Sequence, residues 1–435
     1  MVKLSANFLS LNKISSMKKT ILLFIIGFLF IPNGFGQKSY GKILIDSLCS
    51  ERYDGRGYVN NGDVRAGDFI IRELKSIGVN SFKKKTYSQP YKINVNTFPY
   101  PMHVVLGTDT LAIGADYLVN PYSGSAQGDF KVEEINTDNF YSKYSGEIDL
   151  SSRKKEQKIY AFNFTDIEDA KLRQKIKGMA MKAMNYFPII WVEKNKQMYS
   201  VGRGQMNYPL ISIDSAKYKT VSTVNLKINN SYKPQYKTKN IIGFIPGKKK
   251  RKYIVLSAHY DHLGRMGQAI FPGANDNASG VAMLLSVAKH FMQNKPKYSI
   301  VLCFFSGEEA GLEGSKYFVQ HPYFKLKRVK FVLNVDIMGG ADNGITIVNG
   351  TKHQSHFDTI VKINEANKYL KVVKRRGPTA NSDHYYFSQS GVPAFFIYSM
   401  GSVKNYHDIY DTAENTPLEK FNEVQSLLLD FMATL

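Results

Sequence analysis

Two apolar runs that flank a helical pattern constrain the fold of this chain more than any other feature. Residues 253–258 and 299–305 are rich in Val, Ile, Leu and Phe, and such runs are typical of buried strands in a parallel sheet. Between them, residues 278–291 place apolar side chains at the spacing of one helical face. The stretch therefore predicts a strand–helix–strand unit whose two strands are parallel.

The alternation of predicted strands and helices continues to the end of the chain. Further strands are expected to end near Val335, Val348 and Tyr398, with helical patterns between and after them. We expect an α/β fold in which a mostly parallel sheet is flanked by helices on both faces. Residues 237–435 would form the main part of this domain, and residues 37–99 its N-terminal part.

Residues 100–236 have a different sequence pattern. Short β-type runs alternate there with turns and charged clusters, and one helical stretch at 170–184 interrupts them. No constellation of catalytic side chains occurs in this part of the sequence. We interpret it as a smaller insertion domain that is β-rich or α+β.

The chain is strongly basic, with 58 Lys and Arg against 36 Asp and Glu and a formal net charge of +22. Such a balance favours attraction to nucleic acid or to anionic surfaces. The one dense run, KKKRK at 248–252, lies between two β-type runs. We interpret it as a solvated hairpin turn among otherwise dispersed lysines. No zinc-finger, RNA-recognition or helix-turn-helix pattern accompanies it, so we expect no nucleic-acid partner.

The N-terminus has the features of a secretory signal peptide. Two lysines precede an apolar run at 21–31, which is too short to span a bilayer comfortably, and a small-x-small pattern ends at Gly36. We expect residues 1–36 to be a signal peptide cleaved near Gly36. The protein would then be exported, to the periplasm or outside the cell, with no stable membrane anchor. An uncleaved anchor is the alternative.

The chain contains two cysteines, Cys49 and Cys303. An exported protein could pair them. Because Cys303 lies inside the second apolar strand, we expect it to be a buried free thiol instead.

Polar residues gather at the carboxyl ends of the predicted strands, where open α/β sheets bind their ligands. Five of them flank the first strand–helix–strand unit: His259, Asp261, Asp276, Glu308 and Glu309. One imidazole and four carboxylates buried together without partners would be costly in free energy. A divalent metal site would satisfy all of them.

Two further residues belong to the same predicted edge. Asp336 follows the expected strand at 331–335, and His407 lies beyond the expected strand at 393–398. A set of carboxylates and two imidazoles without Cys suits zinc or a neighbouring divalent metal, and two-metal hydrolytic sites use such ligands.

Several motifs resemble, in the same order, those of the M28 family of dizinc aminopeptidases: HYDHLG, GANDNASG, SGEEAGLEGS, NVDIMG and YHDIYDT. The resemblance covers residues 237–435. The earlier segments YDGRG and RAGDFIIRELKSIGV also resemble the N-terminal helices of that family. Residues 100–236 are similar, with degenerate motifs, to the protease-associated domains that some of these enzymes carry. The resemblance implies a zinc-exopeptidase-like fold and two Zn²⁺ ions as cofactors.

The resemblance also assigns roles to individual residues. It implies that Asp276 is shared between two zinc sites, one completed by His259 and Asp336 and the other by Glu309 and His407. It further implies a cis peptide bond between Asp276 and Asn277, which aims the bridging carboxylate.

Two more roles concern residues that are not ligands. Asp261 would accept a hydrogen bond from the far nitrogen of His259 and so fix its tautomer. Glu308 would act as the general base, taking a proton from the attacking water and passing it to the leaving amine. The substrates implied by the resemblance are the N-termini of peptides or proteins. Four residues are weaker candidates for substrate binding: Asp383, His384, Tyr385 and Tyr406.

Three other functions remain open for this sequence. A glutaminyl-cyclase-like transferase has a similar fold with a single zinc. A carboxypeptidase of the same superfamily would act at the other end of the peptide. A non-catalytic binding module could keep the fold without the chemistry, although all seven expected positions are filled here. The sequence does not indicate an oligomeric state.

Overall fold

The computed structural model describes residues 39–83, 85–144, 157–194 and 196–435. The expected signal peptide, residues 1–36, lies outside the described residues. Among the described residues, no helix combines the length and the apolar character needed to cross a bilayer.

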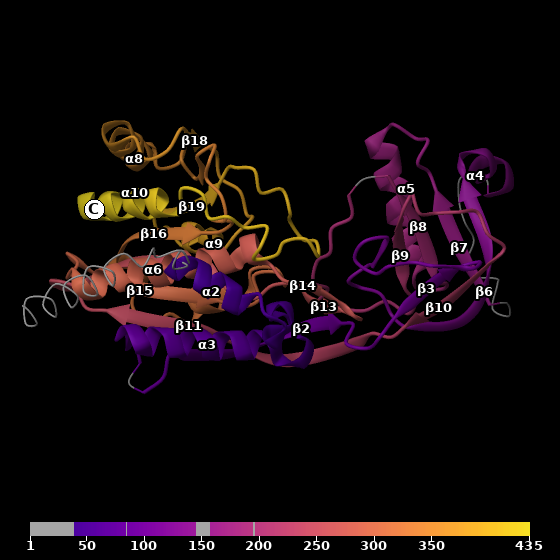
Figure 1. Cartoon of the computed structure of the whole chain (residues 1–435), viewed down its shortest axis with the longest axis horizontal. Helices are drawn as coiled ribbons and strands as arrows, with labels where there is room; N and C mark the ends of the chain where they lie inside the picture. The colour runs from indigo at the N-terminus through magenta and orange to yellow at the C-terminus, as the bar shows by residue number, and fades with distance from the viewer. Residues whose placement is uncertain (1–38, 84, 145–156, 195) are drawn as a thin grey trace, which may run out of the picture. The chain divides into compact units, whose positions relative to one another are not determined.

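The larger of the two main sheets has nine strands and carries the predicted strand–helix–strand unit (Figure 1). Its strands are β1 (Asn80–Ser81), β2 (Ser88–Thr97), β11 (Ser231–Ile245), β12 (Lys249–His259), β15 (Tyr298–Phe305), β16 (Val329–Val335), β17 (Ile345–Val348), β18 (Val373–Arg375) and β19 (Ala394–Ser399). They lie in the order β1-β11-β15-β12-β16-β19-β17-β18, and β2 pairs with β11.

The centre of this sheet is parallel, as predicted, and its flanks are antiparallel. Strands β15, β12, β16 and β19 run parallel to one another. Strand β11 is antiparallel to β15, and β17 is antiparallel to β19. Strands β15 and β16 are buried along almost their whole length, and β12 is buried from Tyr253 onwards, which matches their continuous apolar sequences.

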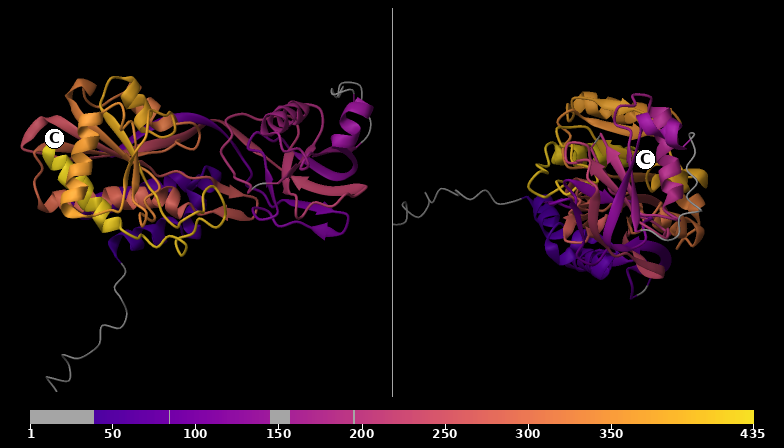
Figure 2. Two further views of the ribbon diagram at one scale, coloured as in Figure 1. Left: turned by 90° about the horizontal axis from the view of Figure 1, so that it is seen from above. Right: turned by 90° about the vertical axis from the view of Figure 1, so that its right-hand side faces the viewer.

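Helices cover both faces of the sheet (Figure 2). On one face Ile254 and Leu256 of β12 share a core with α2 (Tyr40–Leu48), α3 (Gly62–Ile77), α6 (Ser279–Gln293), α8 (Gln354–Asn367) and α10 (Phe421–Thr434). On the other face Val255 packs with residues of α7 (Glu313–Gln320) and α9 (His384–Gln389). Successive residues of a strand point to opposite faces, so a run that is apolar throughout can fill both cores.

Residues between His103 and Ile228 form a second, eight-stranded sheet. Its strands are β3 (His103–Leu106), β4 (Asp109–Thr110), β5 (Tyr117–Val119), β6 (Ala126–Asn136), β7 (Lys158–Asn163), β8 (Ile189–Glu193), β9 (Leu210–Asp214) and β10 (Thr223–Ile228), with helices α4 (Thr137–Tyr144) and α5 (Ala170–Ala183). The mixture of strands and helices agrees with an α+β insertion. Strand β11 runs through the predicted boundary at 236/237 without a break.

A small hairpin of the main domain contributes side chains to the core of this second sheet. Its strands are β13 (Gly264–Met266) and β14 (Ala269–Phe271). Met266 and Phe271 belong to the same apolar cluster as Phe98 and Val104. The two sheets are therefore joined by packed side chains as well as by the chain itself.

The hairpin turn expected at 248–252 is wrong. Strands β11 and β12 are not neighbours, because β15 lies between them. Lys249 begins strand β12, and the residues from there to Lys252 are exposed. Cys303 is a buried free thiol, as expected, and Cys49 is also free.

Candidate metal centre

The predicted ligands meet at the carboxyl edge of the parallel strands. His259 is the last residue of β12, Glu308 and Glu309 follow β15, and Asp336 follows β16 directly. Asp276 lies in η3 (Ala274–Ala278), the π-helical turn that leads into α6. His407 comes from the loop after β19. This convergence confirms the expected placement of the polar residues at one edge of the sheet.

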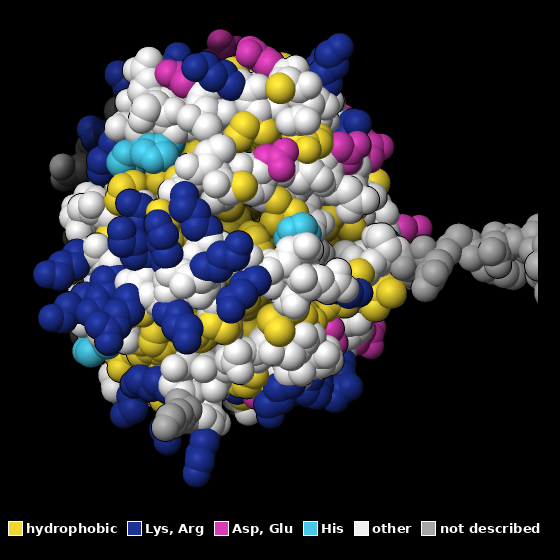
Figure 3. Space-filling model, turned by 90° about the vertical axis from the view of Figure 1, so that its left-hand side faces the viewer, with side chains coloured by type: hydrophobic (Ala, Val, Ile, Leu, Met, Phe, Trp, Pro, Cys, Tyr) yellow, Lys and Arg dark blue, Asp and Glu magenta, His cyan; other side chains and the backbone are white. Residues whose placement is uncertain are grey.

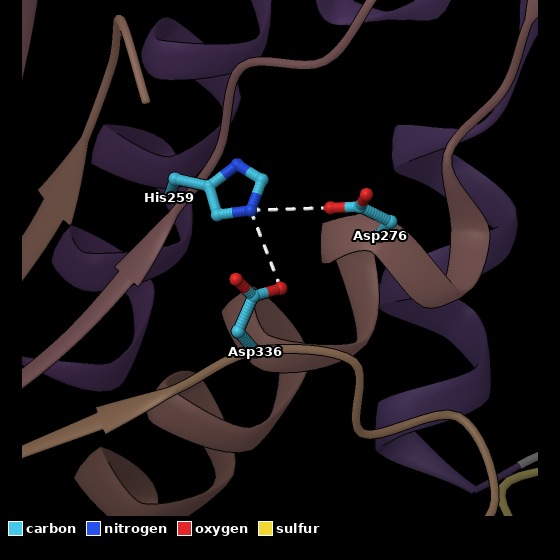
Figure 4. A group of neighbouring side chains, drawn as sticks. All are labelled: His259, Asp276 and Asp336. Carbon is cyan, nitrogen blue, oxygen red and sulfur yellow. Dashed lines mark ion pairs between the residues drawn. The ribbon is translucent and has the colours of Figure 1, made fainter. Parts of the chain in front are cut away.

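The first cluster consists of His259, Asp276 and Asp336, and is called the His259 group (Figure 4). His259 Nε2 lies 3.2 Å from Asp276 Oδ1 and 3.3 Å from Asp336 Oδ1. All three side chains are buried.

The second cluster consists of His407, Asp276 and Glu309, and is called the His407 group. His407 Nε2 lies 3.1 Å from Asp276 Oδ2 and 3.3 Å from Glu309 Oε2. The two oxygens of Asp276 thus face different histidines, so one carboxylate belongs to both groups.

The segment that carries Asp276 is held by residues far away in the sequence. Asp411 accepts hydrogen bonds from the main-chain N–H groups of Asn275 at 2.8 Å and Asp276 at 3.0 Å. The buried Arg56 donates to the carbonyls of Pro272 and Gly273, each at 2.6 Å. The peptide bond between Asp276 and Asn277 is cis, as expected.

The Asp261 carboxylate is placed differently from the expectation. His259 Nδ1 hydrogen-bonds the main-chain carbonyl of Asp261 at 3.0 Å, whereas the Asp261 carboxylate lies 3.8 Å from that nitrogen. The carboxylate instead accepts from the Tyr58 hydroxyl at 2.6 Å and from the N–H groups of Glu308 and Glu309, each at 3.3 Å. Asp261 therefore organises the loop that carries the two glutamates, while its carbonyl orients the imidazole.

His407 is oriented by a residue of the 100–236 segment. Its Nδ1 hydrogen-bonds the carbonyl of Tyr199 at 2.8 Å, across 208 positions of sequence. In return the N–H of Tyr199 donates to the carbonyl of His407 at 3.0 Å. The Tyr199 side chain is buried and packs against Phe271 with a ring separation of 5.0 Å.

Glu309 is oriented by His262, to which the sequence assigned no role. His262 Nδ1 lies 2.8 Å from Glu309 Oε1, so the other oxygen of Glu309 is directed to His407. Gly273, at φ 62°, leaves room for the His262 ring, since a Cβ there would lie 2.3 Å from it.

Opposite charges hold the shared carboxylate and the two imidazoles together. Burial alone lowers the pKa of His259, but the Asp336 and Glu308 carboxylates hold it well above its ordinary value. Burial also lowers the pKa of His407, but Glu309 and Asp276 raise it to about 11. Burial raises the pKa of Asp276, and its hydrogen bonds with both histidines overcome this and hold it well below its usual range.

In two other carboxylates, Asp336 and Glu308, the charge of His259 lowers the pKa but does not overcome burial. Burial raises the pKa of Asp336, and burial together with Glu309 and Asp383 raises that of Glu308 well above its ordinary value. Asp336 Oδ1 faces His259 Nε2 at 3.3 Å but accepts no well-aligned hydrogen bond among the described residues, while its Oδ2 accepts from Ser382. A buried carboxylate oxygen that is aimed at the cluster without such a hydrogen bond fits a bound cation, and the imidazole–carboxylate donor set fits zinc.

The weaker candidates divide into two pairs. Asp383 is buried close enough to raise the pKa of Glu308, and Tyr406 stacks on the His407 ring with centroids 4.0 Å apart. His384 is buried against Phe396, and Tyr385 packs beside Tyr386. A role in substrate binding stays a prediction for all four residues.

Sequence signals existed for some of the residues that were missed. Arg56 lies within YDGRG and Asp411 within YHDIYDT, two of the motifs that carried the resemblance. Tyr199 lies in no motif, so its contact with His407 follows only from the three-dimensional structure.

A mixed α/β sheet with a histidine–carboxylate centre at its carboxyl edge defines the class of this protein as an α/β metalloprotein. Residues 240–432 match the family model described as Peptidase family M28.

Curated relatives match parts of the chain. A protein named "Probable leucine aminopeptidase" from Arthroderma otae is 28% identical over 219 residues, which are 46% of this chain and 58% of the relative. A "Vacuolar membrane protease" from Candida glabrata is 29% identical over 174 residues, 40% of this chain and 16% of the relative. The chain thus spans less than two thirds of the length of these relatives.

Solved structures resemble the fold over most of the chain. A peptidase M28 precursor from Shewanella amazonensis SB2B has a TM-score of 0.66 at 18% identity, covering 91% of this chain and 93% of that one. A zinc aminopeptidase from Bacillus subtilis has a TM-score of 0.65 at 16% identity, covering 91% and 94%. At these identities the likeness shows the fold alone.

Proposed function

We propose that the chain is an exported dizinc aminopeptidase that hydrolyses the N-terminal peptide bond of peptides or proteins. The observation that carries the proposal is the position of Asp276, whose two oxygens face His259 and His407 separately. The match of residues 240–432 to a peptidase family model supports the reaction type. The aminopeptidase names of a relative and of a solved structure support the exopeptidase class.

The two groups would each hold one zinc ion. His259, Asp276 and Asp336 supply three donors to the first, and His407, Asp276 and Glu309 supply three to the second. When bound, zinc would supply Lewis acidity towards the scissile carbonyl and would lower the pKa of the attacking water.

Glu308 is the residue best placed to move the proton. One of its carboxylate oxygens lies within 4.8 Å of donor atoms of His259 and Glu309. Within the described residues, it forms no ion pair with either histidine. Its main-chain N–H is held by Asp261 at 3.3 Å, which fixes the start of the loop. Glu308 would take a proton from the attacking water and deliver it to the leaving amine.

Metal analysis combined with a substrate panel tests this proposal. The purified chain should retain two zinc ions per molecule after dialysis and should hydrolyse aminoacyl-p-nitroanilides. The matching N-acetylated compounds should resist it, because they lack the free α-amino group.

Other outcomes favour the alternatives. A single bound ion with cyclisation of N-terminal glutamine would favour the transferase. Hydrolysis of N-acetylated peptides from the carboxyl end would favour the carboxypeptidase. Absence of any turnover by the zinc-loaded protein would favour the binding module.

A further inference from the structure

Eleven Lys and Arg side chains collect at the amino ends of three neighbouring strands. Strand β12 lies between β15 and β16 in the sheet, and each of these strands is preceded by or begins with cations. This set, called the basic edge, consists of Lys248, Lys249, Lys250, Arg251 and Lys252 at β12, Lys295 and Lys297 at β15, and Lys325, Lys327, Arg328 and Lys330 at β16. The sheet therefore gathers three separate sequence segments into one basic surface.

The basic edge has no compensating acidic residues of its own. Residues 246–253, 292–298 and 321–331 contain no Asp or Glu. Within the part of the chain that the structure describes, none of the eleven forms an ion pair, and all but Arg328 are exposed. Figure 3 shows Lys and Arg gathered over one face, with Asp and Glu mostly at its margin.

Like charges are forced close together in this surface. The ammonium groups of Lys249 and Lys297 both lie over the ring of Tyr298, at 5.7 and 5.1 Å from its centroid. Self-repulsion among such groups destabilises a folded chain. An anionic partner would relieve that repulsion.

A cavity of about 650 Å³ opens beside the basic edge. Lys295 and Lys297 line it together with apolar Phe291, Leu429 and Met432. Asp430 also lines it and accepts a hydrogen bond from the Tyr369 hydroxyl at 2.9 Å. Cations beside a partly apolar hollow match the headgroup and upper acyl region of a lipid surface better than a nucleic acid.

We propose that the basic edge docks the protein on an anionic phospholipid surface. Each Lys or Arg near an anionic lipid surface contributes about 1 kcal/mol of attraction, so a cluster of eleven cations suffices for docking. The docking is electrostatic and therefore sensitive to salt.

The position of the basic edge also orients the docked molecule. Lys249 and His259, the first and last residues of β12, pair with Tyr298 and Phe305 at the two ends of β15, about 23 Å apart at the rise of a strand. The metal centre thus lies at the opposite ends of the same strands and stays open to solvent when the basic edge is docked.

Vesicle co-sedimentation of the full chain tests the proposal, using vesicles of phosphatidylcholine alone or with one quarter phosphatidylglycerol. The unaltered protein should bind only the anionic vesicles at low salt and should dissociate in about 0.5 M salt. The affinity of the variant K250E/R251E/K327E for the anionic vesicles should be lower by at least about 100-fold, since each lost cation contributes roughly a factor of five.

A matched variant, K131E/K171E/K175E, carries the same change of charge at exposed lysines of the second sheet and of α5. It should bind within about threefold of the unaltered protein, and circular dichroism should show both variants folded. If both variants lost the same affinity for the vesicles, binding would depend on net charge alone, and the proposal would be overturned. Absence of binding to anionic vesicles, or tighter binding to double-stranded DNA than to the vesicles, would also overturn it.

Discussion

The His259 group and the His407 group share Asp276 but are supported by different parts of the chain. His259 ends β12, Asp336 follows the adjacent β16, and the Nδ1 partner of His259 is a carbonyl only two residues away. His407 lies in a loop, and its Nδ1 partner is the carbonyl of Tyr199, in the segment between β8 and β9. One group is thus built by the central sheet, and the other depends on a distant segment.

Two ion pairs extend this dependence. Lys196 pairs with Asp408, next to His407, and Arg203 pairs with Glu313, just beyond the loop of Glu308 and Glu309. Residues 196–203 therefore contact both loops that supply the His407 group. Two similar ligand sets in one site can therefore be held by different parts of the chain.

The largest effect should come from the residue that the two groups share. Asp276→Ala removes one donor from each, so zinc content should fall from two ions towards none. Turnover should fall about 1000-fold or more, since a metal contributes several kcal/mol to the reaction. Metal analysis after dialysis measures the first effect. Retention of one ion at unaltered affinity would show that Asp276 belongs to one group only.

Asp411 is the support common to both groups. Asp411→Ala leaves the N–H groups of Asn275 and Asp276 without their acceptor. The free energy of unfolding of the metal-free protein should fall by about 1–3 kcal/mol for each N–H group. Both zinc affinities should fall by about 10–100-fold. Urea denaturation and chelator competition measure the two effects, and weakening of a single zinc would contradict the common support.

Substitution of Tyr199 should weaken zinc binding by the His407 group and leave the His259 group unchanged. Tyr199→Ala removes the buried ring that anchors the carbonyl facing His407. One zinc should bind about 10-fold more weakly, while the other is unchanged in chelator competition. Tyr199→Phe keeps the ring packed on Phe271 and should restore normal binding. Equal weakening of both ions, or no rescue by Phe, would remove the distinction between the two groups.

The smallest effect is expected at Tyr58. Tyr58→Phe removes the hydrogen bond to the Asp261 carboxylate, which holds the loop of both glutamates. Both ions should remain, and kcat should fall about threefold to tenfold, the scale of one hydrogen bond. A change in zinc stoichiometry would mean that Asp261 supports the ligands rather than Glu308.

Sequence patterns were sufficient for the central sheet and for the residues at its edge. The apolar runs of β12, β15 and β16 fix their own ends, so the polar residues that follow must lie together at one edge. Such runs do not determine which strands are neighbours in the sheet. For that reason the sequence predicts a hairpin turn at 248–252, whereas β15 lies between β11 and β12 in the sheet.

The supports of the site were harder to predict than its ligands. Asp411 and Arg56 act on main-chain groups, and such contacts leave no spacing pattern in a sequence. Tyr199 contributes its carbonyl, which every residue type has, so its identity carried no signal. Asp261 was expected to contact His259 through its carboxylate, but its carbonyl does so instead.

The central claim is that Glu308 moves the proton while its neighbour Glu309 holds a metal. Zinc stoichiometry and kcat of Glu308→Gln and Glu309→Gln test it most directly. Glu308→Gln should keep two ions and lose about 100-fold or more in kcat. Glu309→Gln should lose one ion, with activity partly restored by added zinc. The reverse pattern would exchange the two roles, and near-normal turnover in both variants would contradict the dizinc hydrolase.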